Sequence, residues 1–422
     1  MLRKNQQGFG HLWLFVLIVF IIGSVGFVGW RVYRNQHQHG RPVINNYVAH
    51  QQEGHITNTG QKGNASGYLE PQDLAGCNGN AVLTSPLADP GTYTSITPLG
   101  NTSSYNGNVG HVQPVNHLYL NHSGPPTTAN GSPIEPIPLT APGNIEIFQV
   151  TATDHINTAG VDQLNDNKLY FATCKDVIFW VDHVTGLNPA ITQALTSAAQ
   201  QSCQSIVMDN LTYKSCTYNT NIKLSAGTLM GKGGADFGAV DYRTKPQAFL
   251  RPSAQQYLNT ACGLDYFAEP YKTQMYNKLN TTRTGANGLP SCGTDLWDKS
   301  GTIQGDWYLP SAPTSGGGID PYTLAITPLN TDPSQGNIDW GGTIAPADRI
   351  DYKTTTGGFI NRDPATITAD GHIYCFDDLS HGYAYARSVS VQLSDANTLK
   401  IQYHTGACPA NPTLTAPTTY IR

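Results

Sequence analysis

Histidine and aspartate are the residues of this sequence whose positions suggest metal or acid–base chemistry. Three histidines, His111, His117 and His122, lie close together in GHVQPVNHLYLNH, while His183 ends an apolar run and Asp236 follows a glycine-rich stretch. Imidazole nitrogens and carboxylate oxygens both bind zinc, and imidazole is the usual general base near neutral pH. Structural alternatives exist for all of them: a hydrogen-bonded core histidine at 183, a turn or cap aspartate at 236, and solvated surface histidines for the other three.

The elements that would position these residues are short strands separated by turns. Strands are predicted over residues 144–150, 169–172, 176–183, 222–224, 228–230 and 235–240. Alternation along VIFWVDH places His183 on the same face as Val177, Phe179 and Val181. Asn188-Pro189 predicts the N-cap and first residue of a helix that reaches about residue 201.

The composition favours β structure in the rest of the chain as well. Charged residues make up only 13% of the sequence, and its 43 glycines and 27 prolines favour short strands and turn-rich connections. After residue 250 we predict a helix at 271–279, loops over 280–345, and a hairpin at 388–393 and 398–404. The expected fold class is therefore mainly β, with a small sandwich-like domain followed by an irregular β-rich C-terminal region.

The N-terminus predicts a membrane anchor. Leu12–Trp30 contains no charged residue and is long enough to cross the hydrocarbon core as a helix. A cleaved signal peptide is the alternative, but no small-x-small cleavage site follows the apolar run. Gly8-Phe9 before the run also faintly resembles a type IV prepilin leader, although Trp13 stands where a pilin has glutamate. The predicted organisation is a stub and anchor at 1–34, a flexible stalk at 35–75, and domains at 76–250 and 251–422.

The eight cysteines indicate an oxidising compartment. All lie after the apolar run, their number is even, and none forms a CxxC pair, which fits disulfides better than zinc knuckles. We therefore place the chain after about residue 34 outside a cell. Loop spacing predicts the pairs Cys203–Cys216, Cys375–Cys408 and Cys262–Cys292, which leaves Cys77 to pair with Cys174.

Three segments between residues 139 and 243 resemble the lysostaphin-type zinc endopeptidases, the duplicated-hybrid-motif family that cuts peptidoglycan cross-bridges. In chain order they are LTAPGNIEI, VIFWVDHVTGL and IKLSAGTLMGKGGADFGAV, which begin at residues 139, 177 and 222. The chain also resembles degenerate relatives of the family that carry Asp-Phe-Gly on the last of these strands. The resemblance covers about a quarter of the chain, and it implies the family's fold for that part.

The resemblance implies an altered zinc site. The family has an early His-x-x-x-Asp, a base histidine in mid-chain and a His-x-His on the last strand. Here His183 occupies the base position, but the early motif reads His117 to Asn121 and the last reads Gly-Ala-Asp236. A rearranged zinc site of His111, His117 and Asp236, with His183 as the catalytic residue, is the chemically consistent expectation.

Three functions follow from this sequence. The first is a membrane-anchored envelope protein that binds peptidoglycan or another surface polymer without cleaving it. The second is an active zinc endopeptidase with a rearranged site, and the third is a pilus-like or structural surface component. The net charge of −5 without a basic block argues against nucleic-acid binding. Oligomeric state stays open.

Overall fold

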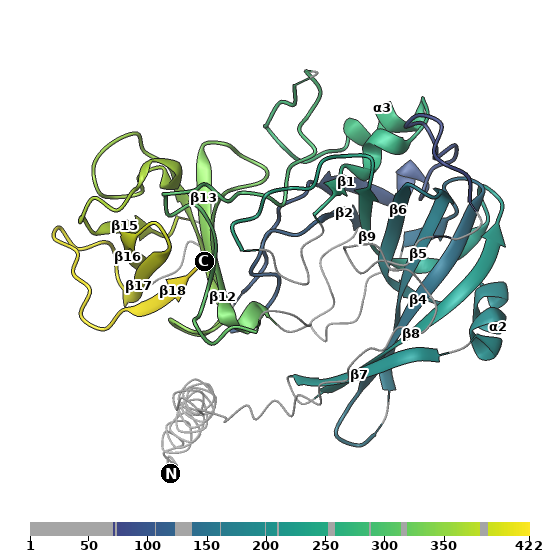
Figure 1. Cartoon of the computed structure of the whole chain (residues 1–422), viewed down its shortest axis with the longest axis horizontal. Helices are drawn as coiled ribbons and strands as arrows, with labels where there is room; N and C mark the ends of the chain where they lie inside the picture. Colours follow the sequence, from purple (N-terminus) through teal and green to yellow (C-terminus); the bar gives the residue numbers. More distant parts are fainter. Residues whose placement is uncertain are drawn as a thin grey trace, which may run out of the picture. The chain divides into compact units, whose positions relative to one another are not determined.

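The computed structural model describes residues 71, 74–105, 107–122, 137–160, 162–198, 200–208, 211–251, 258–286, 288–313, 319–379 and 387–422. Over this part of the chain the protein is mainly β, as predicted, and forms two antiparallel sheets of ten and eight strands (Figure 1). The predicted transmembrane helix and nearly all of the predicted stalk lie outside the described residues. Within them, every helix is too short or too polar to span a bilayer.

The first sheet brings together strands that are far apart in the sequence. Its order is β1-β2-β9-β6-β5-β4-β8-β7, and β3 and β10 also pair with β9. The strands are β1 Tyr93–Thr97, β2 His117–His122, β3 Ile137–Thr140, β4 Ile145–Ile156, β5 Asp162–Cys174, β6 Val177–Thr185, β7 Gln200–Met208, β8 Leu211–Leu224, β9 Leu229–Asp241 and β10 Thr260–Ala261. The helices of this region are η1 Pro90–Thr92, α2 Pro189–Ser197, η2 Gly263–Tyr266 and α3 Tyr271–Tyr276. Because β9 lies between β2 and β6, these three strands share one continuous surface.

The two faces of this sheet bury different residues because side chains alternate along each strand. One face holds the main core, where Phe179 stacks between Phe171 and Phe237 and where residues of η2 and α3 add cover. On the opposite face, Tyr170 and Trp180 belong to a smaller apolar cluster. The part of that face beyond this cluster is polar, and it contains the candidate site.

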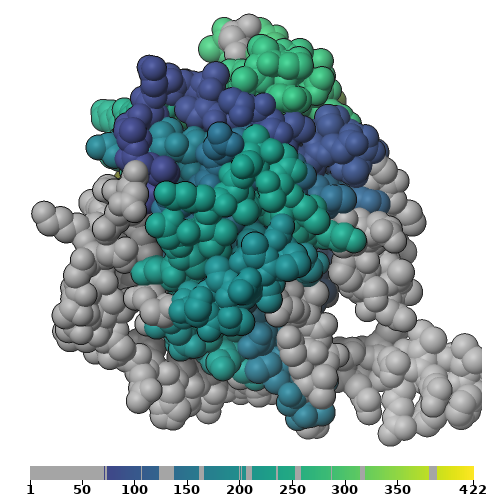
Figure 2. Space-filling view, turned by 90° about the vertical axis from the view of Figure 1, so that its right-hand side faces the viewer, coloured from purple at the N-terminus to yellow at the C-terminus, as the bar shows by residue number. Residues whose placement is uncertain are grey.

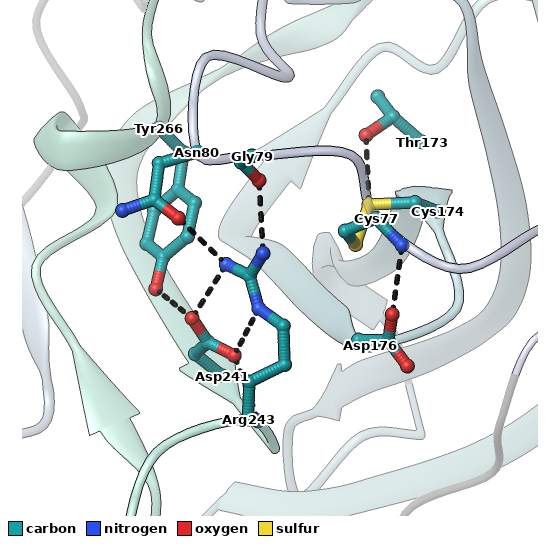
Figure 3. Close-up of a disulfide and its surroundings, with 9 residues drawn as sticks. All are labelled: Cys77, Gly79, Asn80, Thr173, Cys174, Asp176, Asp241, Arg243 and Tyr266. Carbon is teal, nitrogen blue, oxygen red and sulfur yellow. Dashed lines mark hydrogen bonds and ion pairs between the residues drawn. A yellow bond between two sulfur atoms is a disulfide. The ribbon is translucent and has the colours of Figure 1, made fainter.

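The segment that precedes β1 is fastened to the first sheet by a disulfide and an arginine. Cys77 is bonded to Cys174 at the end of β5. Arg243, which follows β9, donates to the carbonyl of Gly79 at 2.8 Å and pairs with Asp241 at 2.7 Å (Figure 3). In the space-filling view of this side of the molecule, the early segment, coloured purple to blue, lies above the teal residues (Figure 2).

The second sheet is formed by the C-terminal part of the chain, with the order β14-β13-β12-β11-β18-β17-β16-β15. The strands are β11 Gly305–Tyr308, β12 Thr323–Pro328, β13 Gln335–Trp340, β14 Asp348–Lys353, β15 Tyr374–Asp377, β16 Arg387–Asp395, β17 Thr398–Thr405 and β18 Thr418–Ile421, with η3 Asp320–Tyr322 and η4 Pro364–Thr366 between them. Trp307 and Trp340 are fully buried in its core. Both tryptophans therefore contribute to the packing of this sheet.

Several predicted elements are confirmed. The strands expected near 144–150, 169–172 and 176–183 are β4, β5 and β6, although β4 and β5 are much longer than predicted. Asn188 caps α2, since its side chain accepts a hydrogen bond from the amide of Ala190. That helix ends at Ser197 rather than near residue 201, and β7 begins at Gln200. The hairpin of β16 and β17 also forms as expected.

Other predicted elements are wrong. The segment expected to be loops, 280–345, contains β11, β12 and β13, so the C-terminal region is an ordered sheet rather than an irregular one. These strands are only four to six residues long and bury polar residues such as Thr327 and Asp339, which removes the apolar alternation that marks a strand. The two strands predicted at 228–230 and 235–240 are one strand, β9.

All four predicted disulfides are present: Cys77–Cys174, Cys203–Cys216, Cys262–Cys292 and Cys375–Cys408. The domain boundary expected at residue 250 stays a prediction. Leu264, Tyr266 and Met275, which follow that boundary, pack in the core of the first sheet.

Candidate functional site

The candidate site lies on the polar part of the face opposite the main core. The strand register pairs Tyr119 of β2 with Asp236 of β9, and Asp236 with Asp182 of β6. Residues directly opposite each other on neighbouring strands point to the same face, with their Cβ atoms about 4.5–5.5 Å apart. Three strands thus place their polar side chains in one row. Asp236 lies in the middle of β9, so its interpretation as a turn or cap residue is wrong.

A bulge in β6 brings His183 to this row. Regular alternation would leave His183 on the core face, but the register shifts between Asp182 and Val184 and His183 adopts a φ of 58°. A bulge re-aims the side chain at its position. Gly233 on β9 leaves room for it, because a Cβ there would lie 2.7 Å from the carbonyl oxygen of His183. The His183 side chain is 56% exposed, so it is not a core histidine.

Asp236 is shared by two histidines. Its Oδ2 lies 3.4 Å from Nε2 of His117 and 3.5 Å from Nε2 of His183. The side chains of His117 and Asp236 are only 10% and 8% exposed, so water does little to screen their interaction. On the other side of its ring, Nδ1 of His117 lies 3.3 Å from the side-chain oxygen of Asn116. The solvated-surface alternative is therefore wrong for His117.

His111 approaches the same place from the loop before β2. The centroids of the His111 and His117 rings are 5.5 Å apart, with the ring planes nearly perpendicular. Although His111 is an exposed residue, loss of hydration around its ring, followed by the charge of His117, lowers its pKa to about 4. The His111 imidazole is thus neutral at pH 7, which is the form that binds metal ions.

His183 has the opposite electrostatic environment. Its Nδ1 donates a hydrogen bond to Oδ2 of Asp166 at 2.8 Å. That hydrogen bond, with further contributions from the charges of Asp236 and Asp182, raises the pKa of His183 to about 9. The carboxylate fixes the orientation of the ring, and a pKa of about 9 keeps the His183 imidazole mainly protonated at pH 7, so that in the metal-free protein it is a proton donor at that pH.

Asp166 and its neighbours on β5 were missed by the sequence analysis. Asp166 also lies 3.5 Å from Nε2 of His155 on β4, and Lys168 pairs with Asp182 at 2.9 Å. The strand was predicted to begin at Leu169, whereas β5 begins at Asp162. The sequence offered no alternation as a signal there, because Asp166, Asn167 and Lys168 are all polar.

The structure therefore brings together the four predicted site residues, His111, His117, His183 and Asp236. It leaves out Asn121, the residue at the family's aspartate position. The side-chain amide of Asn121 instead donates to the hydroxyls of Ser95 and Thr97 on β1, at 3.0 Å each. His122, the third clustered histidine, pairs in register with Tyr93 at the far end of β2.

Two of the predicted ligands, His117 and Asp236, have donor atoms at the spacing of ligands on one metal ion. When Nδ1 of His117 donates its proton to Asn116, Nε2 presents a lone pair toward the carboxylate of Asp236, and Nε2 makes no hydrogen bond in the structure. A cation between the two atoms would satisfy both, as would the other tautomer of His117, in which Nε2 donates to Asp236. Ligand atoms at about 2.0–2.1 Å from a tetrahedral zinc lie about 3.3 Å apart, close to the observed 3.4 Å. His111 lies beside the His117 ring, but none of its nitrogens is within 4.8 Å of both other donor atoms, so a third ligand from His111 would require its loop to move.

Among the described residues, the three possible ligand atoms that lie within 4.8 Å of one another come from Asp166, Asp182 and His183, and not from His111, His117 and Asp236. Both carboxylates already face a cationic partner, since Lys168 lies 2.9 Å from Asp182 and the His183 ring lies 2.8 Å from Asp166. We describe this set as a charge-balanced network that orients His183.

Comparison with protein-family models, with curated proteins and with solved structures finds no match for this chain. The resemblance to lysostaphin-type peptidases therefore remains a hypothesis, and the site has to be judged by its own geometry.

Proposed function

We propose that the first sheet is a duplicated-hybrid-motif scaffold of the lysostaphin type that holds zinc through His111, His117 and Asp236. A membrane helix at Leu12–Trp30 would display it outside the cell, where it binds peptidoglycan or another surface polymer. The observation that supports this most is the close approach of the unbonded Nε2 of His117 to the buried carboxylate of Asp236.

Binding without rapid cleavage is the function that these residues favour. Zinc would supply a Lewis acid for a carbonyl or carboxylate of the polymer. In the family, the first histidine of His-x-His helps to stabilise the charge that develops on the scissile carbonyl, and here Gly234 stands in its place. Loss of one such group typically lowers the rate by about 10²–10³. Asn121 cannot compensate, because β1 holds its side chain.

Hydrolysis is the second candidate, and one observation favours it. Asp166 orients His183 by a 2.8 Å hydrogen bond, and Nε2 of His183 lies 3.5 Å from Asp236. A carboxylate–imidazole pair beside a predicted metal ligand can exchange a proton with a water molecule or a leaving group. Because the pKa of His183 is about 9 in the metal-free protein, the imidazole donates a proton at pH 7 and accepts one from water only where that pKa is lowered or the pH is higher.

Metal content and polymer binding test both candidates. The full-length protein, purified in detergent without chelator, is expected to contain one zinc per chain and to sediment with insoluble peptidoglycan. His117→Ala and Asp236→Ala should lose both properties. His372→Ala, at an exposed histidine in the loop before β15, is the matched control and should keep them.

The outcomes separate the hypotheses. Wild-type protein without zinc after incubation with excess metal would overturn the zinc site. Zinc without sedimentation would overturn polymer binding. Release of soluble muropeptides by the wild type, abolished in His183→Ala, would show that the protein is a peptidase rather than a non-catalytic binder.

A further inference from the structure

Strand β7 lies at one end of the first sheet, and among the described strands it pairs with β8 alone (Figure 1). The strands at the other three ends of the two sheet orders have further partners. The amide of Ile96 in β1 donates to the carbonyl of Lys278 at 2.7 Å. The carbonyl of Asp351 in β14 accepts from the amide of Leu379 at 2.8 Å, and β15 forms a bridge at Cys375 with the loop before η4. Within the part of the chain that the structure describes, β7 is therefore the end strand whose outer edge stays open.

The outer edge of β7 presents backbone hydrogen-bonding groups. Cys203 and Cys216 lie opposite each other on β7 and β8, with their Cα atoms 4.1 Å apart. Opposite residues of an antiparallel pair are about 5.5 Å apart where they bond to each other and about 4.5 Å apart where they do not. Cys203 therefore directs its N–H and C=O away from β8. Ser205, two residues later in regular register with β8, does the same.

This edge lacks the features that keep the edge strands of natural proteins from pairing with other chains. Such strands are usually very short, bulged, or interrupted by proline or charged residues. Strand β7 has nine residues, QQSCQSIVM, with no proline and no charge. The register shift in its pairing lies at its start, between Gln200 and Ser202, and the Cys203–Cys216 disulfide joins the middle of the strand to β8. The strand is thus an ordered template on which another strand can pair.

The side chains of β7 favour an identical strand as the partner. Ser202, Cys203, Gln204 and Ser205 are exposed, and none of them is charged or large and apolar. Domains that bind a foreign peptide by strand addition select it with pockets for its side chains, and short polar side chains exposed on both faces do not form such pockets. A strand without charge can instead pair with its own copy, because no like charges face each other. A second copy of this chain is therefore the partner that fits the edge.

We propose that β7 is a self-association edge through which two copies of this chain join into one continuous antiparallel sheet. Self-pairing about a two-fold axis is isologous, so the same residues contribute from both copies. With the axis at Gln204, Cys203 of each copy faces Ser205 of the other, and each such pair exchanges two backbone hydrogen bonds. The inference concerns the outer edge of β7, and it depends neither on a metal ion nor on a polymer bound to the first sheet.

The first test measures self-association of the full-length protein in detergent by sedimentation equilibrium, and the wild type is expected to form a dimer. In Ser205→Pro the outward N–H is lost from both copies, while the hydrogen bonds to β8 stay, because the N–H of Ser205 points away from β8. The loss of two hydrogen bonds should weaken the dimer about 10–100-fold. Ser205→Ala keeps the N–H and is the matched control, with the association of the wild type.

The second test asks whether β7 lies at the two-fold axis. Gln204→Cys places a thiol where the two copies face each other, and it should give a disulfide-linked dimer on a non-reducing gel after mild oxidation. Gln193→Cys, at an exposed position of α2, is the matched control and should stay monomeric on that gel. Circular dichroism checks that every variant keeps its fold. Ser205→Lys, which adds a charge to the edge and leaves the backbone unrestricted, replaces Ser205→Pro if the proline variant does not fold.

Three results would overturn the proposal: a wild-type protein that is monomeric at every concentration, a dimer that neither Ser205→Pro nor Ser205→Lys weakens, or cross-linking of Gln204→Cys no faster than that of Gln193→Cys. The second result would place the dimer interface elsewhere in the chain.

Discussion

Gly238→Ala tests whether the sheet that presents the site is packed as described. Gly238 on β9 lies opposite Trp180 on β6 and opposite His117 on β2. A Cβ on Gly238 would lie 1.9 Å from Cζ2 and 2.0 Å from Cε2 of the Trp180 indole. Carbon atoms in contact are about 3.5–4.0 Å apart, so the ring would have to move by about 1.5–2 Å.

The ring has nowhere to move without cost, because Trp180 is fully buried. Overpacking of this kind typically costs about 1–3 kcal/mol. For a domain of this size, each kcal/mol lowers Tm by about 2–4 °C, so we expect Gly238→Ala to lower Tm by about 2–12 °C. The measurement is thermal unfolding followed by circular dichroism in chelator, which removes any contribution from bound metal.

The matched control is Gly357→Ala. A Cβ on Gly357 meets no atom within 4 Å, and its φ is not in the left-handed region. Alanine at such a position restricts the unfolded chain and typically stabilises by about 0.4–1 kcal/mol. The two variants should thus shift Tm in opposite directions. A Gly238→Ala protein as stable as the wild type would refute the packing of β9 against Trp180.

Three further predictions concern the disulfides, the site and the anchor. Replacing Cys77 and Cys174 by serine should lower the free energy of unfolding by about 4–5 kcal/mol, because the disulfide joins residues 97 apart and so restricts the unfolded chain. The measurement is denaturant titration, and a loss below about 1 kcal/mol would contradict this explanation. In metal-free protein, NMR titration should find the His183 pKa near 9 and a lower pKa in Asp166→Asn. Because that pKa exceeds the unfolded value of about 6.5, the stabilisation by His183 is complete below pH 6.5 and disappears as the pH rises through 9. If Asp166→Asn left the pKa of His183 unchanged, the hydrogen bond between His183 and Asp166 would be contradicted. Full-length protein should require detergent for extraction, since Leu12–Trp30 is uncharged; release by salt alone would rule out the anchor.

The sequence by itself determined the features that depend on local chemistry. The mainly β class, the strands around Val177–His183, the cap at Asn188 and the β16–β17 hairpin follow from alternation, capping and turn residues within a few positions of each other. The four disulfide pairs expected from loop spacing are also present, although spacing by itself does not fix the pairing of eight cysteines.

The tertiary structure decided the composition of the site. Alternation placed His183 on the core face, and only the bulge in β6 turns it toward Asp166 and Asp236. Asp166 itself became visible only when β5 proved to begin seven residues earlier than predicted, at Asp162. A bulge depends on how neighbouring strands register, and no pattern within one strand reports it.

The position of His111 was the feature that the sequence could least predict. Its loop is held by Asp320 and other residues of the second sheet, whose short, polar strands were expected to be loops. Local patterns determine which segments form strands and turns. The position of a loop depends on hydrogen bonds to residues more than 200 positions away, and those bonds exist only after both sheets have formed.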